Sequence, residues 1–156
     1  MTDFTNTIRI ERPINEVFSY LSDLERIPEW NWAIADTKQI TPGPIAVGTR
    51  YRQTRTVPRP ATEILELTTL DPDQRIEVRG VLAGMAAHLT YLLADDSSGT
   101  VLTNTVSLDA DGPVRLLAPI LGRRIAGAVA SNLNDLKTRL EAPEGTTRTE
   151  AVDLDH

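Results

Sequence analysis

Asn104 is the polar residue whose position says most about possible chemistry. It lies in a segment, Thr100 to Leu108, in which apolar and polar side chains alternate. One side of this segment consists of Leu102, Asn104, Val106 and Leu108. Because alternate residues of a strand point to opposite faces, this mostly apolar side is predicted to face the interior. A buried amide without partners costs about 1–3 kcal/mol. Asn104 is therefore predicted to bind a ligand carbonyl or hydroxyl, or else to bond to Tyr91 or to ordered water.

Aromatic residues supply the other candidate contacts for a small molecule. Tyr91 is predicted to face inward with Leu89 on the preceding strand. Its hydroxyl could act as a donor or weak acid, or it could simply be a core tyrosine with its hydroxyl at the rim. Trp30 and Trp32 are two positions apart. We expect one of them to pack in the core and the other to cover a pocket, and we favour Trp30 for packing.

The sequence contains no familiar catalytic or cofactor-binding motif. The segment from Gly80 to Gly84 lacks the lysine of a phosphate-binding loop. There is no cysteine, and the histidines are His88 and the last residue, His156. A metal site or a serine triad would therefore depend on His88, whose strand position predicts an outward side chain. Glu63 and Glu66 are predicted to lie on opposite faces of one strand, which does not support a general acid/base pair. We expect neither a cofactor nor a metal.

Charge argues against a nucleic-acid partner. The formal net charge is −6, and a protein of that balance repels phosphate backbones. Arg50, Arg52 and Arg55 are interpreted as an outward strand face, and Arg79 as solvent-exposed. Arg55 would meet an anionic ligand group only if it faced inward.

The periodicity of apolar residues predicts an α+β fold. A strand over residues 5–11 precedes Pro13, after which apolar residues from Ile14 to Leu21 follow helical spacing. Another helical turn over residues 24–27 is expected to end at Pro28. Segments with strand-like composition, separated by turn residues, then predict an antiparallel meander. They cover residues 34–40, 49–57, 62–70, 75–81, 86–94 and 100–108.

A long C-terminal helix is predicted from apolar residues that recur every three or four positions between Leu117 and Leu140. Pro119 is expected either to kink this helix or to mark its start. The small residues between Gly122 and Ala130 would either let the sheet approach closely or leave empty volume. The candidate ligand contacts on this helix are Leu121, Ile125 and Val129.

Several short motifs follow one another along the chain in an order that resembles a known family. They are Ile10-Glu11-Arg12-Pro13-Ile14-Asn15-Glu16-Val17-Phe18, Asp23 through Trp30, Gly48-Thr49-Arg50, Asp71-Pro72, Gly99 through Thr103, and Leu133 through Glu141. In these features the chain resembles the START-like (SRPBCC) superfamily and its polyketide cyclase/dehydrase-like branch, over roughly residues 4–141.

The resemblance implies a helix-grip fold. In this fold a seven-stranded curved antiparallel sheet surrounds a long C-terminal helix, and two short helices follow the first strand. It also implies that ligands lie between the long helix and the concave sheet and enter past the short helices. Because the superfamily has no universal catalytic motif, the resemblance implies no catalytic residue.

These observations predict one START-like domain over residues 1–141, followed by a polar tail over 142–156. No signal peptide or transmembrane segment is apparent, so we expect a cytoplasmic protein. The predicted function is binding of a small apolar or aromatic molecule of the lipid, polyketide or isoprenoid class. A polyketide cyclase or dehydratase using the same cavity is the alternative, and a homodimer is left open. The candidate ligand-binding residues are Asn104, Tyr91, Trp30, Trp32, Leu89, Leu102, Val106, Leu121, Ile125 and Val129.

Overall fold

The computed structural model describes residues 2–82, 84–109 and 115–143. Its elements are β1 (Thr2–Ile10), α1 (Ile14–Ser22), η1 (Leu24–Arg26), α2 (Ile27–Trp30), β2 (Ile34–Gln39), β3 (Arg50–Arg55), β4 (Ala61–Asp71), β5 (Arg75–Leu82), β6 (Met85–Asp96), β7 (Gly99–Asp109) and α3 (Ala118–Glu141). The strands form one sheet in the order β1-β7-β6-β5-β4-β3-β2, with every neighbouring pair antiparallel. The predicted helix-grip α+β architecture is confirmed. The predicted turn at 111–113 and the tail beyond 143 lie outside the described residues.

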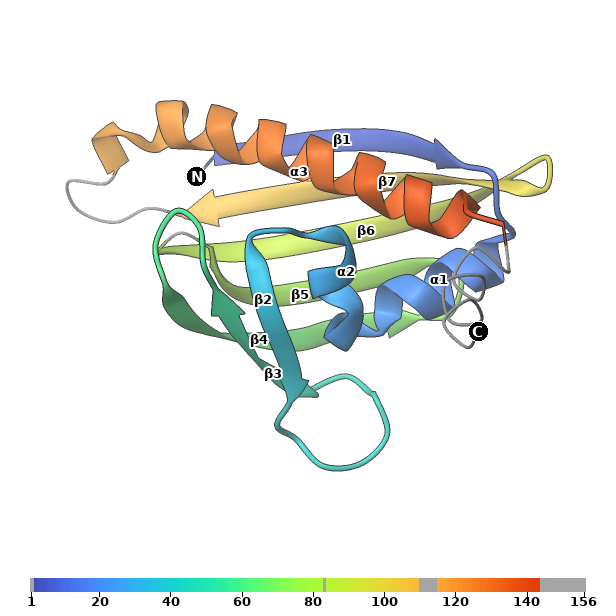
Figure 1. Ribbon diagram of the computed structural model, residues 1–156, viewed down its shortest axis with the longest axis horizontal. Helices are drawn as coiled ribbons and strands as arrows, with labels where there is room; N and C mark the ends of the chain where they lie inside the picture. The colour runs from blue at the N-terminus through green and yellow to red at the C-terminus, as the bar shows by residue number, and fades with distance from the viewer. Residues whose placement is uncertain (1, 83, 110–114, 144–156) are drawn as a thin grey trace, which may run out of the picture.

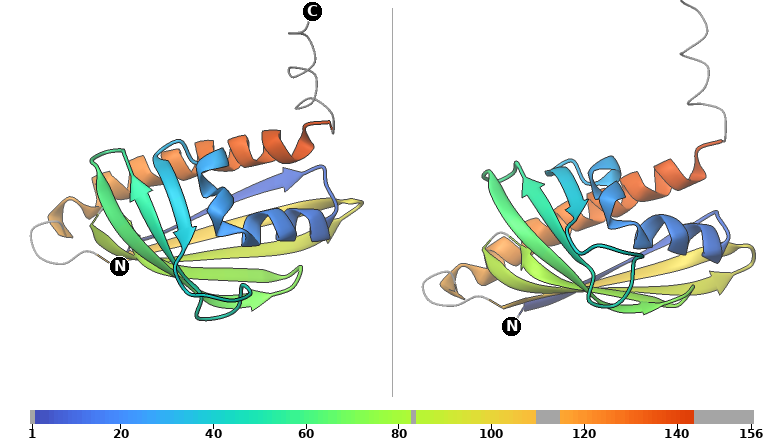
Figure 2. Two further views of the ribbon diagram at one scale, coloured as in Figure 1. Left: turned by 60° about the horizontal axis from the view of Figure 1, so that its bottom comes forward. Right: turned by 90° about the horizontal axis from the view of Figure 1, so that it is seen from below.

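The sheet is strongly curved, and all helices lie on its concave side (Figures 1 and 2). The long helix α3 extends across the open side of the sheet, close to β1 (Figure 1). The short segments α1, η1 and α2 cover the part of the same side that α3 leaves open (Figure 2). The main core lies between these layers, because apolar side chains of α1, α2, α3 and the inner sheet face form one buried cluster.

Alternation along the strands determines which side chains face the helices. On β7, Leu102, Asn104, Val106 and Leu108 are all buried, as predicted. On β3, Tyr51, Gln53 and Arg55 are buried, whereas Arg50 and Arg52 are exposed. The interpretation of Arg55 as an outward residue is therefore wrong. This strand is polar on both faces, so Tyr51 alone marks the inner one.

Two prolines show how the helices begin. The expectation that Pro28 ends a helical turn is wrong, because Pro28 lies in the first turn of α2. Proline is tolerated there, since the N–H groups of a first turn have no intrahelical acceptor. Pro119 takes the same position in α3 and marks its start, one of the two predicted options.

The C-terminal half of α3 is attached to the rest of the fold by three cationic side chains. The Nε of Arg12 donates to the carbonyl oxygen of Leu140 at 2.6 Å. The Nζ of Lys137 donates to the carbonyl oxygen of Arg9, also at 2.6 Å, and Arg139 donates to that of Glu29. No helix in the described part of the chain is long and apolar enough to cross a membrane.

Candidate functional site: a cavity between the sheet and the long helix

A cavity of about 90 Å³ lies between the inner face of β3–β7 and the helices α1, α2 and α3. Its wall is mainly apolar, formed by residues such as Leu24, Ile27, Leu65, Ile76, Val78 and Leu133. Six polar side chains also reach it, namely Asn31, Gln53, Arg55, Tyr91, Asn104 and Asn132. The volume is several times the ~10–15 Å³ that one water molecule needs. Few convergent polar groups on an apolar wall are typical of small-molecule sites.

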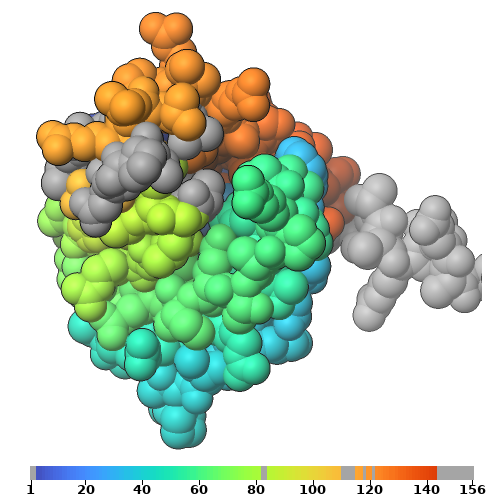
Figure 3. Space-filling view, turned by 90° about the vertical axis from the view of Figure 1, so that its left-hand side faces the viewer, coloured from blue at the N-terminus to red at the C-terminus, as the bar shows by residue number. Residues whose placement is uncertain are grey.

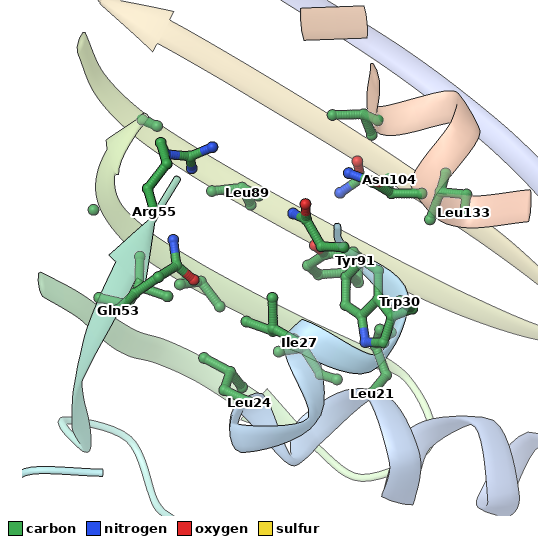
Figure 4. A pocket seen from close by; sticks show the side chains of 18 of the residues that line it. Leu21, Leu24, Ile27, Trp30, Gln53, Arg55, Leu89, Tyr91, Asn104 and Leu133 are labelled. Atoms are coloured by element: carbon green, nitrogen blue, oxygen red, sulfur yellow. The ribbon is translucent and has the colours of Figure 1, made fainter. Parts of the chain in front are cut away.

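The polar side chains gather at two ends of the cavity. Figure 4 shows Arg55 and Gln53 at one end, and Asn104 with Tyr91 and Trp30 toward the other. Leu89 lies between the two groups (Figure 4). Arg55, at the first end, is the last residue of β3, just before the connection to β4. This connection is in the green part of the face shown in Figure 3.

The first polar end is built on a buried ion pair. The Nε of Arg55 donates to Oε1 of Glu63 at 2.5 Å, and its Nη2 donates to Oε2 at 3.2 Å. The Nε2 of Gln53 donates to the same Oε2 at 2.9 Å. The Arg55 and Glu63 side chains are only 8% and 5% exposed. Charges buried to this extent are stable only when paired, and here each compensates the other.

The second polar end holds amide oxygens without protein partners. Nδ2 of Asn104 donates to the carbonyl oxygen of Thr90 at 3.2 Å, while its Oδ1 is buried and accepts no hydrogen bond. Oδ1 of Asn132, on α3, is likewise buried and unpartnered. The predicted alternative in which Asn104 bonds to Tyr91 is not what the structure shows. Tyr91 lies directly opposite Asn104 in the strand register, but the amide is bonded to the neighbouring main chain.

Tyr91 contributes a neutral phenol to the cavity wall. Burial raises the pKa of its hydroxyl well above the ordinary value, because the phenolate would lose its hydration. The hydroxyl is therefore protonated at neutral pH and can donate a hydrogen bond. Among the described residues, no side chain or main-chain group bonds to it.

The predicted contact residues separate into three groups. Trp30, Leu89, Tyr91, Asn104 and Val129 line the cavity. Leu102 and Val106 are fully buried in the core, and Ile125 packs on a second cluster around Met85. The side chain of Leu121 lies outside the described residues.

Trp32 occupies a different place from its neighbour Trp30. It is 62% exposed, whereas Trp30 is 7% exposed and packs in the core as favoured from the sequence. Trp32 borders a separate, more open surface depression together with Pro28, Glu29 and Arg139. It does not contribute to the wall of the main cavity.

The stretch of small residues on α3 is not what creates the cavity. Gly127 and Ala128 are exposed, and a Cβ added at Gly127 would meet no atom within 4 Å. Of the described side chains between 122 and 130, Val129 alone lines the cavity, which continues along α3 to Asn132 and Leu133.

Sequence reasoning missed Gln53, Arg55 and Asn132 as wall residues. Asn132 could have been found, because it lies three residues after Val129 and four before Leu136 on the same helical face. Gln53 and Arg55 gave a weaker signal, since polar side chains occur on both faces of β3.

His88 lies on the outer face of the sheet, as expected. Its side chain is 45% exposed, and Nε2 is 3.8 Å from Oε1 of Glu77. It is therefore remote from the cavity wall. Within residues 2–82, 84–109 and 115–143, no group of three or more histidine and carboxylate side chains is placed to hold a metal ion.

A family model described as polyketide cyclase/dehydrase and lipid transport matches residues 1–141. The chain belongs to this family. No curated protein matches its sequence. The match over residues 1–141 confirms the START-like resemblance. It supports a role either in hydrophobic-ligand binding or in polyketide cyclisation.

Three solved structures illustrate how far the fold is shared. The Thermus thermophilus protein TTHA0849 has a TM-score of 0.74 and 17% identity, covering 89% of this chain and 97% of that one. The Zhui aromatase/cyclase from Streptomyces sp. R1128 has a TM-score of 0.71 and 14% identity, covering 90% and 93%. The di-domain aromatase/cyclase BexL of the BE-7585A biosynthetic pathway has a TM-score of 0.73 and 18% identity, covering 90% of this chain and 47% of that one. At these identities the likeness concerns the fold.

Proposed function

We propose that this family member binds an uncharged, mostly apolar small molecule of the lipid, polyketide or isoprenoid class between the sheet and α3. The observation that carries the proposal is the cavity itself, a mainly apolar space enclosed by β3–β7 and the helices. A ligand there would remove apolar surface from water on both partners, which is favourable by ~25 cal/mol per Å².

The uncharged character of the ligand follows from the ion pair in the cavity wall. Arg55 is held by Glu63 through two hydrogen bonds, so the pair carries no net charge. An anionic ligand would lose its hydration on entering the cavity, and it would find Arg55 already paired with Glu63. A neutral molecule avoids that penalty.

The test uses the uncharged fluorescent probe N-phenyl-1-naphthylamine in titrations, together with native mass spectrometry of freshly purified protein. Val129→Phe places a larger side chain on the cavity wall, whereas Ala128→Phe places the same side chain on the exposed side of α3. We expect the wild type and Ala128→Phe to bind the probe, and Val129→Phe to bind at least about tenfold more weakly. Equal probe binding in all three proteins would refute the proposal.

A polyketide cyclase or dehydratase activity is the second candidate. It is favoured by the protonated Tyr91 hydroxyl on the cavity wall, which can donate to a substrate carbonyl oxygen and stabilise negative charge that develops there. An enclosed apolar space would also hold a reactive chain in a folded conformation, so that proximity does much of the catalysis.

Turnover of a poly-β-ketone thioester analogue tests this candidate. Tyr91→Phe should abolish turnover and leave substrate affinity measurable. Tyr20→Phe, which changes a half-buried tyrosine that does not line the cavity, should keep turnover. Unchanged turnover in Tyr91→Phe would reject Tyr91 as the acid.

A further inference from the structure

Two buried hydrogen-bond acceptors lie unpartnered at the α3 side of the cavity. Asn104 is 0% exposed and Asn132 is 6% exposed, and both line the cavity. Their Oδ1 atoms accept no hydrogen bond from any described residue. Figure 4 shows Asn104 beside the segment of α3 that carries Leu133, the neighbour of Asn132.

The orientation of the Asn104 amide is determined by the main chain. Its Nδ2 donates to the carbonyl oxygen of Thr90 at 3.2 Å. The reversed amide would bring Oδ1 against that carbonyl oxygen, which is an acceptor facing an acceptor. The group that Asn104 leaves free is therefore an acceptor, and it requires a donor.

We infer that the ligand carries a hydroxyl group, of an alcohol or a phenol, that donates its one proton to the amide oxygen of Asn104, with the amide of Asn132 as a second polar contact in the cavity. This inference rests on the proposed function and specifies the chemistry of its ligand. A ligand that offers only carbonyl or ether oxygens would leave the buried Asn104 oxygen without a donor. The cost of such an unsatisfied acceptor makes the site selective for a donor.

Two groups within the protein could compete for this role, the Tyr91 hydroxyl on the facing strand β6 and the amide of Asn6 on β1. Asn6 lies directly opposite Asn104 in the register of β1 and β7, and its Nδ2 is also buried and unpartnered. A donation from Asn6 would satisfy the Asn104 oxygen and leave the Asn132 oxygen unchanged. The experiment therefore includes a variant at this position.

Three probes with one framework separate donor recognition from apolar binding. Isothermal titration calorimetry compares 2-naphthol, which has a donor, with 2-methoxynaphthalene, which has only an acceptor, and with naphthalene, which has neither. We expect the wild type to bind 2-naphthol about tenfold more tightly than either of the others. The comparison with naphthalene excludes a steric effect of the methoxy group.

Leucine variants assign the preference to the two amides. Asn104→Leu and Asn132→Leu should each reduce the preference for 2-naphthol several-fold while naphthalene still binds. Asn134→Leu changes an exposed asparagine of the same helix and should preserve the preference. Asn6→Leu should preserve it as well.

The possible failures are distinguishable. If no naphthalene derivative binds, the proposed function itself is refuted for ligands of this size. If all three probes bind equally to the wild type, the donor requirement is wrong and the cavity proposal stands. A preference that appears only in Asn6→Leu would show that Asn6 already satisfies Asn104, and would overturn the inference. A preference that survives in both Asn104→Leu and Asn132→Leu would overturn it too.

Discussion

Arg55 and Glu63 place two opposite charges beside an apolar cavity. We predict that Glu63→Gln lowers the free energy of unfolding by about 3–5 kcal/mol, because it leaves the Arg55 charge buried without its partner. The double variant Arg55→Met/Glu63→Leu should be much closer to the wild type, since both charges are removed together. Urea unfolding of the three proteins measures these differences.

A surface ion pair provides the matched control for this prediction. Arg79 and Glu66 approach to 2.7 Å on the outer face, where their side chains are 67% and 31% exposed. Glu66→Gln should change stability by less than about 1 kcal/mol, because water screens that pair. A similar loss in Glu63→Gln and Glu66→Gln would contradict the importance we assign to burial.

Tyr51 makes the stability of the fold sensitive to alkaline pH. Burial, reinforced by Asp23 and Glu25, raises the pKa of its hydroxyl from 10.0 to about 12. The folded state thus favours the neutral phenol, a contribution fully present below pH 10 and lost as pH rises from about 10 to 12. We expect unfolding free energy to fall across that interval, and to fall less in Tyr51→Phe. Denaturant titrations at stepwise pH measure both slopes.

The same substitution has an expected effect at neutral pH. The Tyr51 hydroxyl is buried without a hydrogen-bond partner, so Tyr51→Phe should leave stability unchanged or raise it by about 1 kcal/mol. A loss of more than about 1 kcal/mol would show that the hydroxyl is satisfied in solution.

At the level of side chains, the sequence was most informative where one strand face is apolar. Asn104, Tyr91 and Leu89 were placed on the cavity wall because β6 and β7 alternate clearly. Arg55 was placed on the wrong face because β3 is polar on both sides, and its direction depends on pairing with Glu63 of β4. Contacts between separate strands are not contained in the periodicity of either one.

Among the elements, α3 is attached unequally along its length. Its C-terminal half is held by Arg12, which binds the carbonyl oxygen of Leu140, and by its own Lys137 and Arg139, which bind carbonyl oxygens of β1 and α2. Leu117 and Ile120 near its start are exposed. We predict slower amide hydrogen exchange from Val129 to Leu140 than in the first two turns.

A variant of Arg12 tests the origin of this difference. Its guanidinium donates to the carbonyl oxygens of Leu140, Glu141 and Ala142, which helix ends leave without partners. Arg12→Met should lower stability by about 1–2 kcal/mol and speed exchange in the last turns. Arg59→Met, an exposed loop position, is the control. Unaltered exchange near Leu140 would show that packing alone holds the helix end.

The elements themselves were largely predictable, since each strand ends where proline, glycine or aspartate interrupts an alternating segment. The error at Pro28 came from treating proline as a terminator when it also suits the first turn of a helix. For the same reason the sequence allowed Pro119 either to kink α3 or to mark its start. The structure shows that Pro119 lies in the first turn of α3.

For the whole molecule, fold and cavity differ in how far the sequence could predict them. The antiparallel order follows from successive short turns, and the resemblance in motifs such as Ile10 to Phe18 pointed to the same family as the match over residues 1–141. The position of the cavity did not follow, because volume depends on how α3 lies on the sheet. Its small residues Gly127 and Ala128 face away from the wall.

The buried ion pair also limits how the sequence can change over generations. A single replacement of Arg55 or Glu63 leaves an uncompensated charge buried beside the cavity. Selection against unstable proteins would remove such single variants. The two positions should therefore change as a unit among relatives of this chain, either both charged or both uncharged. Relatives without the pair would have a more apolar wall at that end, where Gln53 remains, and with it a different range of ligands.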